Sequence, residues 1–332
     1  MRHSSPDEPG ITRRRRGRGF SHHLPSGRLV DDATRARIDE LAVPPVWQDV
    51  WICTDPDAHL LATGVDEAGR TQYLYHPRWR AARDREKFDR ALELAPRLPG
   101  MRRRLREDLR GRGASRARVT AVALWLLDTG RLRVGSTAYE QEHGSHGVTT
   151  LLVEHVHDRG DGVCLEFPAK GGQLASVAVT DEDVVGALRA LRRAGRPGDH
   201  LLRHGDASAR QDLGAGALAE HFVELVGEGF SVKDLRTWAA TVTAAESLAR
   251  SARAGEDDEE AVRTAIDAAA DSLGDTATVA RDSYVDPRVL DAHREGRRVR
   301  PTRGTPLEHS DEVRRRVERE LVALLGGGRM SR

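Results

Sequence analysis

Lysine is the scarce basic residue of this 332-residue chain, and its scarcity singles out candidate proton carriers. Only Lys87, Lys170 and Lys233 are lysines among the 53 basic residues, and all the others are arginines. Arginine keeps its proton at neutral pH, whereas lysine can act as an acid or a base once its surroundings shift it. Positions that need only a positive charge have drifted to arginine, so each remaining lysine is a candidate for chemistry.

Four short stretches place charged side chains beside glycines or helix starts. They are Arg131-Leu-Arg-Val-Gly-Ser136, Phe167-Pro-Ala-Lys-Gly-Gly172, Ser231-Val-Lys-Asp-Leu-Arg-Thr237, and Leu273-Gly-Asp-Thr276 ahead of Ser283-Tyr284. The chain has no Walker loop, no HExxH or GxSxG motif and no carboxylate cluster of the kind that holds two magnesium ions. The motif content therefore argues against the common NTPases and hydrolases.

These groups suit a metal-free transesterification of a phosphodiester. A tyrosine hydroxyl can attack phosphorus, arginines can neutralise the equatorial oxygens of the transition state, and a lysine can protonate the departing sugar oxygen. Of the four tyrosines, Tyr73, Tyr75 and Tyr139 lie elsewhere, whereas Tyr284 follows a helix break in the helical half. Tyr284 is the candidate nucleophile, and an ordinary half-buried tyrosine is the alternative.

The pattern along the chain predicts an α+β protein with two domains. Residues 1–19 are polar and rich in arginine, and we expect a disordered basic arm that either tracks DNA or is a solvated tail. Residues 20–84 alternate short apolar pieces with turns and predict a small β-rich DNA-binding domain. Residues 85–305 predict a mainly helical catalytic domain, and 306–332 a C-terminal helix and tail.

A three-stranded antiparallel sheet is expected inside the helical domain, over Val148–Val156, Gly162–Phe167 and Gln173–Val179. Lys170 falls in the turn between the last two strands. Helix starts are marked by Thr180 with Asp183, and by Ser231 with Asp234, because a hydroxyl followed three residues later by a carboxylate caps free amide groups.

Composition and charge exclude several classes of protein. The apolar runs are too short to cross a bilayer, and no signal peptide follows the N-terminal arginines, so we expect a cytoplasmic, nucleoid-associated protein. Cys53 and Cys164 lack metal-ligand spacing and are expected to be buried thiols. Residues 1–150 are net positive and residues 151–300 net negative, so the first half is the one suited to facing an anion.

The order of the motifs resembles the type IB DNA topoisomerases, in their compact bacterial, poxvirus-like branch. The resemblance runs from about Gly17 to Pro287. It includes Arg-x-Gly after a helix, Phe-x-x-Lys on a hairpin, Lys-Asp-Leu-Arg-Thr, Leu-Gly-x-Thr nine residues upstream of the tyrosine, and in the first domain Gly-Arg-Gly-Phe20, Val43-Pro-Pro-Val-Trp47 and Gln72-Tyr-Leu-Tyr-His-Pro77. Each piece is short, but their order is specific.

The resemblance implies a role for each matching residue. Tyr284 would be the nucleophile, Arg133 and Arg236 would stabilise the transition state, Lys170 would be the general acid, and Lys233 would assist proton transfer. Residues at DNA-contacting positions would be Gln72, Tyr73 and Tyr139. The family's fold joins a β-rich domain to a helical catalytic domain with a small sheet, and its members need no cofactor, metal or nucleotide. We expect a monomer that binds duplex DNA.

Two assignments stay open, and one position departs from the family. Arg131 becomes the relevant arginine if the register around Arg133 is wrong, and Gln72 and Tyr73 suit a hydrogen-bonded hairpin equally well. Asp275 occupies a position that carries histidine or asparagine in the family, where it donates to a nonbridging phosphate oxygen. An ionised carboxylate there would repel that oxygen, so it is protonated, points elsewhere, or slows cleavage.

Two rival functions follow from the same residues. A tyrosine site-specific recombinase would use the same nucleophile and arginines, but its second-arginine motif begins with histidine, where this chain has Lys233. A non-catalytic DNA-binding relative, disabled by Asp275, is the second rival. The sequence favours a topoisomerase that relaxes supercoiled duplex DNA through a 3′-phosphotyrosyl intermediate, independently of ATP.

Overall fold

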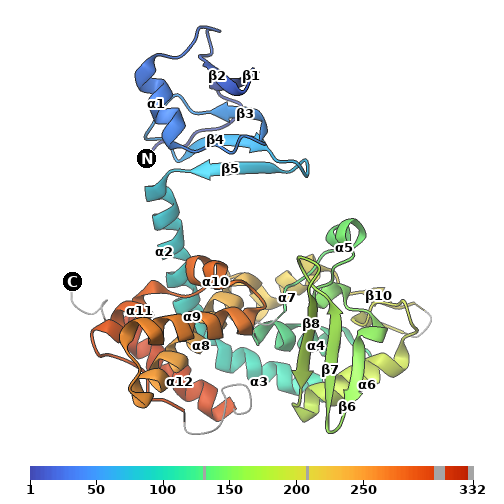
Figure 1. Cartoon of the computed structure of the whole chain (residues 1–332). Helices are drawn as coiled ribbons and strands as arrows, with labels where there is room; N and C mark the ends of the chain where they lie inside the picture. Colours follow the sequence, from blue (N-terminus) through green and yellow to red (C-terminus); the bar gives the residue numbers. More distant parts are fainter. Residues whose placement is uncertain (130–131, 207–208, 303–310, 328–332) are drawn as a thin grey trace. The chain divides into compact units, whose positions relative to one another are not determined.

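The computed structural model describes residues 1–129, 132–206, 209–302 and 311–327 (Figure 1). The chain divides into two compact units, Met1–Glu86 and Lys87–Arg332. The division falls two residues after the expected boundary, within a helix that contributes to both units. The C-terminal helix, which we expected as a separate segment, belongs to the second unit.

The first unit is a five-stranded antiparallel sheet with one helix. The strand order is β2-β1-β3-β4-β5. The elements are β1 (Ile11–Arg16), β2 (Gly19–His23), α1 (Asp32–Glu40), β3 (Gln48–Ile52), β4 (Leu60–Val65) and β5 (Thr71–Tyr75). Because side chains alternate along a strand, one face of this sheet is apolar and the other is polar and aromatic.

The apolar face of the sheet carries the core of the first unit. Ile11, Ile52, Ala62 and Leu74 stand opposite one another across four strands. Ile38 of α1 packs with this cluster, so the helix covers this face. On the opposite face the partner positions are Thr12, Trp51, Thr63 and Tyr73, and Tyr73 is 49% exposed.

The prediction of a disordered arm over residues 1–19 is wrong. The arginine run forms β1, which pairs with both β2 and β3. The segment before it is also held, because the Arg2 side chain bonds Asp55 and Glu8, and the Ser4 hydroxyl donates to the Leu60 carbonyl. Composition misled here because this segment is ordered by backbone pairing with other strands, including β3 far along the chain. The backbone of a residue with a polar side chain pairs as well as that of an apolar residue.

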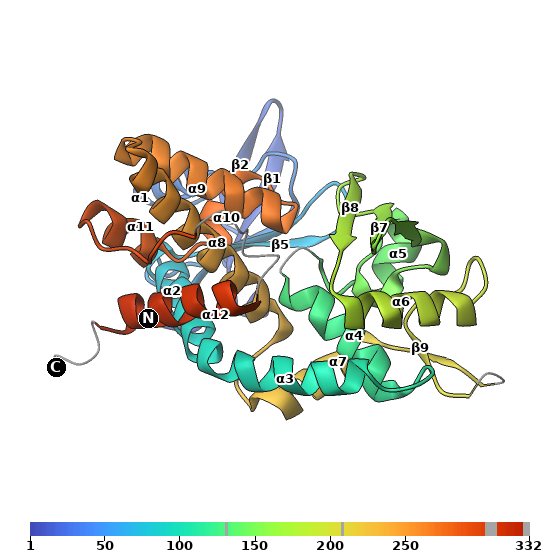
Figure 2. The same ribbon diagram turned by 90° about the horizontal axis from the view of Figure 1, so that it is seen from below.

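The second unit is mainly helical, with one small sheet (Figures 1 and 2). Its helices are α2 (Pro77–Leu94, shared with the first unit), α3 (Leu98–Leu109), α4 (Arg116–Asp128), α5 (Thr137–His143), α6 (Glu182–Ala194), α7 (Ala215–Val226), α8 (Val232–Ala254), α9 (Asp258–Leu273), α10 (Ala277–Ser283), α11 (Pro287–Arg294) and α12 (Asp311–Gly326). Its sheet is β6 (Val156–Arg159), β7 (Gly162–Pro168) and β8 (Leu174–Val179), in that order and antiparallel, and a short pair is formed by β9 (Arg203–His204) and β10 (Gln211–Asp212). Short 3₁₀ turns lie at η1 (Ala95–Arg97), η2 (Val148–Thr150) and η3 (Val153–His155).

Helix α8 is the central element of the second unit. From Leu235 to Val242 every residue is buried, including Trp238 at 1% exposure. A helix that is buried on all sides lies within the core and is fixed by its neighbours, here α4, α9, α11 and α12. A side chain that leaves this helix toward the active site therefore starts from a rigid base.

Two local predictions in the second unit were wrong. Val148–Val156 does not form a strand: it forms η2 and η3, and the sheet begins only at Val156. Its apolar side chains are buried all the same, apart from the half-buried Leu152, and a short apolar run cannot distinguish a buried turn from a buried strand. The helix expected to begin at Thr180 is capped by Asp181, whose carboxylate accepts from the Val184 amide.

Cys53 and Cys164 are free and buried, as the sequence predicted. Among the described residues, no helix is both long and apolar enough to cross a membrane. The same residues contain no group of three or more histidine, cysteine, aspartate or glutamate side chains placed to hold a metal ion.

Candidate active site

The Leu273-Gly-Asp-Thr stretch is a tight connection between two helices. Helix α9 ends at Leu273, Gly274 adopts a left-handed conformation (φ 59°), and the Asp275 amide donates back to the Ala270 carbonyl at 3.0 Å. A glycine at this position satisfies helix-end carbonyls without strain. Thr276 then caps α10, with its hydroxyl 3.3 Å from the Val279 amide. The stretch therefore fixes the position of the Asp275 backbone.

Arg236 projects from the first turns of α8. The helix starts with the predicted capping box, in which the Asp234 carboxylate accepts from the backbone amide and the hydroxyl of Ser231 at 2.7 and 2.9 Å. Arg90 of α2 holds the same carboxylate at 3.1 Å. The Arg236 side chain is only 6% exposed, and it donates to the Leu273 carbonyl at 2.9 Å.

Arg133 lies in an extended segment held by a loop that the sequence did not single out. Its carbonyl accepts from the Val148 amide at 2.8 Å, and Gly135 and Gly147 touch backbone to backbone. A Cβ on Gly147 would lie 2.7 Å from the Arg133 carbonyl oxygen. The close approach therefore requires a residue without a side chain at both glycines. The alternative arginine, Arg131, lies outside the described residues.

Asp275 bridges the two arginines. Its Oδ1 lies 2.6 Å from Arg133 Nη2, and its Oδ2 lies 2.6 Å from Arg236 Nη2. Two arginine groups, each on one oxygen of a planar carboxylate, form the arrangement that also binds two oxygens of a phosphate. The carboxylate thus points into the site, and the alternative that it points elsewhere is wrong.

Tyr284 stands at the end of α10, beside Arg236. The Arg236 Cζ lies 5.2 Å from the centroid of the Tyr284 ring, so the guanidinium group lies over the aromatic ring. Burial and the positive charge of Arg133 lower the pKa of Arg236 from its usual value, and Tyr284 and Asp275 partly offset this. Arg236 therefore lies next to both the carboxylate of Asp275 and the ring of Tyr284.

A threonine that the sequence did not reveal fixes the backbone of the tyrosine. Thr241, buried on α8, places its hydroxyl 3.2 Å from the Tyr284 carbonyl oxygen and accepts from the Asp286 amide at 3.1 Å. Thr241 lies five residues after Arg236 on one rigid helix. The helix that carries the arginine therefore also sets the position of the tyrosine.

The two candidate lysines do not contact this cluster. Lys170 is exposed in the turn between β7 and β8, and within the described parts of the chain it has no hydrogen bond or ion pair. The base of its hairpin is nevertheless tied to the Arg133 segment, because Pro168 accepts from the amide of His146, the neighbour of Gly147. Lys233 is exposed in the first turn of α8, one turn before Arg236.

The expected DNA-contacting residues lie in both units. In the first unit, Tyr73 stacks on Tyr75 at 6.1 Å between ring centroids, and Gln72 donates to Asp66 at 2.8 Å. Backbone and side-chain bonds, chiefly the Arg70 amide, lower the pKa of Asp66 to about 2. Gln72 therefore forms a hydrogen bond within its hairpin, which was the alternative to a DNA contact. Tyr73 forms no such bond with the described residues and remains exposed.

Tyr139 lies on α5 in the second unit, where histidines hold the helix. Tyr139 packs edge-on against His143 at 4.4 Å between ring centroids. Its neighbour Glu140 contacts His200 at 3.2 Å and His146 at 3.3 Å. Burial acts to lower the pKa of His200, but Asp212 and Glu140 raise it above its usual value. These contacts of Glu140 could not be predicted from the sequence, because the partners are up to 60 residues apart.

Comparisons with known proteins match both units of the chain to one kind of protein. The family described as "Eukaryotic DNA topoisomerase I, catalytic core" matches residues 76–294, more than half of the chain, and "Bacterial DNA topoisomerase IB, N-terminal domain" matches residues 19–66. A relative named "DNA topoisomerase 1B", from Acanthamoeba polyphaga mimivirus, is 25% identical over 83% of this chain and 85% of its own length. A second, "DNA topoisomerase 1" from Mycosarcoma maydis, is 26% identical over 48% of this chain but only 17% of its own length.

The matched ranges contain every residue of the cluster. Arg133, Arg236, Asp275 and Tyr284 all fall within the catalytic-core match, and the β-rich unit carries the N-terminal-domain match. The resemblance of the motifs, the α+β fold and the two family matches lead to one assignment. This chain belongs to the type IB DNA topoisomerase family.

Proposed function

We propose that the protein relaxes supercoiled duplex DNA by cutting and resealing one strand at Tyr284. The observation that carries this proposal is the cluster of two buried or half-buried arginines, held 2.6 Å from a shared carboxylate and next to a tyrosine. Such a pair of fixed cations stabilises the negative charge that develops on a phosphodiester under attack. The role of each residue follows from this arrangement.

In the forward step, the Tyr284 hydroxyl oxygen forms a bond to phosphorus and the bond from phosphorus to the 5′ oxygen breaks. Tyr284 releases its proton to solvent as the new bond forms, and Arg133 and Arg236 together hold the nonbridging oxygens. The phosphate takes the place that Asp275 occupies here, so that carboxylate must turn aside. The 5′ oxygen leaves as a hydroxyl, with its proton supplied by Lys170 and with Lys233 assisting.

In the reverse step, the 5′ hydroxyl attacks the 3′-phosphotyrosyl bond and releases Tyr284. The phosphotyrosyl ester preserves the energy of the original phosphodiester, so resealing needs no ATP. Between the two steps the cut strand rotates about its partner and supercoils are lost. We infer that the protein uses neither a nucleotide nor an obligatory metal, and that one copy acts on one duplex.

DNA binding involves both units in this proposal. The exposed Tyr73 lies on the sheet face opposite the one that α1 covers, and Gln72 is the preceding residue of the same edge strand, β5. Tyr139 lies on the short helix that follows the Arg133 segment. These side chains suit contacts with phosphates and base edges, which position the scissile bond.

The experiment that tests the proposal is relaxation of a supercoiled plasmid in EDTA without ATP. We expect full relaxation by the natural chain and none by Tyr284→Phe, which should still bind duplex DNA because only the attacking oxygen is lost. Stopping the reaction in denaturant should trap a protein linked to a 3′ end. Replacing Tyr73, Tyr75 or Tyr139 by phenylalanine is the matched control and should leave some of this adduct.

The outcomes separate the rival functions. A covalent adduct from Tyr284→Phe would place the nucleophile elsewhere. Binding without any adduct from the natural chain would indicate a non-catalytic DNA-binding protein. Strand exchange between defined sites without relaxation would indicate a recombinase.

A further inference from the structure

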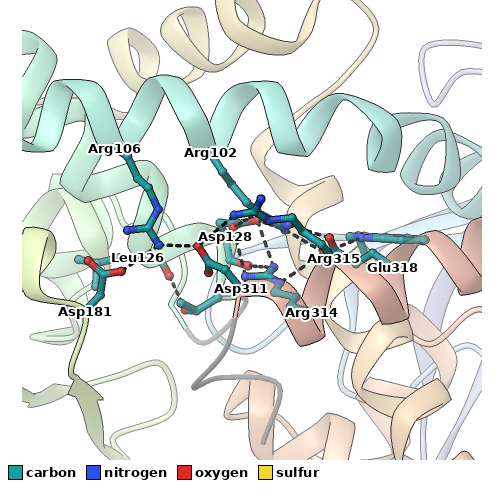
Figure 3. Close-up of polar contacts among 11 residues, drawn as sticks. Arg102, Arg106, Leu126, Asp128, Asp181, Asp311, Arg314, Arg315 and Glu318 are labelled. Atoms are coloured by element: carbon teal, nitrogen blue, oxygen red, sulfur yellow. Dashed lines mark hydrogen bonds and ion pairs between the residues drawn. The ribbon is translucent and has the colours of Figure 1, made fainter. Parts of the chain in front are cut away.

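Four charged side chains form a buried network between the C-terminal helix α12 and the helices beneath it (Figure 3). Arg102 of α3 contacts Asp128 of α4 and Glu318 of α12, each at 2.7 Å. Arg314 of α12 contacts Asp128 at 3.2 Å and Glu318 at 3.3 Å. Two positive and two negative charges thus alternate around a closed ring.

The ring is well shielded from water. The side chains of Asp128 and Glu318 are 6% and 5% exposed, and those of Arg102 and Arg314 are 12% and 19% exposed. Buried charges are costly unless every partner is present, so removal of one member leaves the others uncompensated. Burial alone would raise the pKa of Asp128, but Arg102 and Arg314 lower it by more, so the pKa of this carboxyl lies below its usual value. The ring therefore has one well-defined arrangement.

Through one side, the ring reaches the helix that carries Arg236. Glu318 Oε1 accepts from the indole nitrogen of Trp238 at 3.2 Å, and Trp238 lies two residues after Arg236 on α8. Trp238 is 1% exposed, so its indole group has a fixed position. This bond links α12 directly to the rigid helix at the base of the active site.

Through its other side, the ring reaches the end of α4 that precedes Arg133. Arg314 donates to the Asp128 carbonyl at 2.7 Å as well as to its carboxylate. Asp128 is the last residue of α4, and the carbonyl of Leu132, four residues further along the chain, lies 3.5 Å from Arg236 Nη1. The same ring of charges thus contacts α8, which carries Arg236, and the end of α4, five residues before Arg133.

We propose that α12 is a positioning element for catalysis, in which Glu318 sets Arg236 through Trp238 and Arg314 sets the α4 end that leads to Arg133. The proposal rests on the proposed roles of the two arginines. Helix α12 lies beyond residue 294, outside both family matches, so neither match assigns it a role. None of these side chains touches the reacting groups.

The test begins with Trp238→Phe, which removes the indole donor and keeps an aromatic ring in the core. We expect single-turnover cleavage at saturating DNA to slow about tenfold, because a small misplacement of a charged group is costly in rate. Affinity for DNA should change less than about twofold, since the bond does not face DNA. Trp125→Phe is the matched control: Trp125 is half-buried on α4 and its indole has no hydrogen bond among the described residues.

A double-mutant cycle distinguishes positioning from a general loss of structure. If Trp238 acts through Arg236, then Trp238→Phe should cost less than about twofold in an Arg236→Ala background, yet its full factor in a Lys170→Ala background. A general loss of folding would reduce the rate by the same factor in both. The same factor in both backgrounds, or no loss of rate in a folded Trp238→Phe protein, overturns the proposal.

A second variant tests the acidic partner. Glu318→Gln keeps the shape of the side chain and removes its charge, and we expect the same pattern of non-additivity with Arg236→Ala. Glu320→Gln, which removes the partner of Arg300 on the surface of the same helix, should leave cleavage unchanged. The natural chain and Tyr284→Phe are assayed alongside. A covalent adduct formed by Tyr284→Phe would refute the proposed function. If cleavage requires Tyr284 but the effects of the Trp238 and Arg236 variants are additive, only the role of α12 is refuted.

Discussion

At the scale of single residues, Asp275 is the group that most distinguishes this site. It holds Arg133 and Arg236 in place in the absence of DNA, and it competes with the scissile phosphate for the same nitrogens. The two effects have opposite consequences for activity. A carboxylate keeps the arginines ordered, but its displacement opposes the binding of the phosphate in a productive geometry.

We predict that Asp275→Asn accelerates single-turnover cleavage. Asparagine replaces a competing anion by a group that can donate to a nonbridging oxygen, and one well-placed donor is worth about 10²–10³ in rate. The gain is measured by rapid-quench cleavage of a duplex under saturating protein. Asp271→Asn is the control, because Asp271 is exposed on the preceding turn of the chain. If Asp275→Asn cleaves no faster than the natural protein, competition by the carboxylate is not what limits cleavage.

Lys170 gives the second prediction at this scale. We expect Lys170→Ala to slow cleavage about 10²–10⁴-fold with little change in DNA binding, as the loss of a general acid does. A substrate with sulfur at the 5′ leaving position needs less protonation, so it should rescue Lys170→Ala far more than Arg236→Ala. Lys87→Ala is the control lysine and should cleave normally. Equal rescue of the Lys170 and Arg236 variants would remove Lys170 from the acid role.

The sequence predicted which residues form the cluster but not how they contact each other. Arg133, Arg236, Asp275 and Tyr284 could be found because each lies in a short motif with a fixed spacing. The double ion pair of Asp275 could not, since its arginine partners are 142 and 39 residues away along the chain. Thr241 was missed for the same reason, because nothing in its local sequence refers to residue 284.

At the scale of elements, the β1–β2 hairpin is a surface of unpaired arginines. Arg14 and Arg16 are exposed and lie two and four residues after Thr12, so all three point to the same face of the strand. Thr12 shares the sheet face of Tyr73, and the two arginines therefore do so too. Neither has a carboxylate partner among the described residues, although most arginines of the second unit do. A polyanion that reaches Tyr73 along this face would therefore also meet the hairpin.

We predict that Arg14→Ala combined with Arg16→Ala weakens duplex binding and makes it less sensitive to salt. The logarithm of the binding constant falls with the logarithm of the salt concentration, and each lost phosphate contact makes this slope less steep by about 0.9. The slope of the double variant should therefore be less steep by up to about 1.8. Titrations by fluorescence anisotropy at several salt concentrations measure this slope. Arg15→Ala, on the opposite face of the same strand, should change it less. An unchanged slope in the double variant would show that DNA does not reach the hairpin.

How well an element could be predicted depended on whether its signals are local. The capping box at Ser231 and Asp234 is local, and α8 begins where it predicts. The strand β1 depends on pairing with β3, more than thirty residues on, and it was mistaken for a disordered arm. The apolar run after Gly147 is buried as expected, but its turns could not be told from a strand.

At the scale of the whole molecule, the net charge of +1 conceals how the arginines are used. In the second unit many of them pair with carboxylates, as Arg102 does inside the fold with Asp128 and Glu318, and as the more exposed Arg106 does with Asp181 and Asp311 (Figure 3). These pairs stabilise the packing of helices and contribute little field at the surface. Attraction of DNA therefore depends on the smaller set of arginines that are exposed and unpaired, and whole-chain charge is a poor guide to it.

The contact between Gly135 and Gly147 has a consequence for how this sequence can diverge. A side chain on either residue would run into the backbone of the other, at 2.9 Å or less, beside the carbonyl of Arg133. Because each substitution only adds bulk, a change at one position cannot compensate for a change at the other. In lineages that retain the cleavage activity, neither glycine should therefore be replaced, whether alone or together with the other. A related chain that has lost one of them has, on this argument, been released from selection for the reaction itself, whatever DNA affinity it retains.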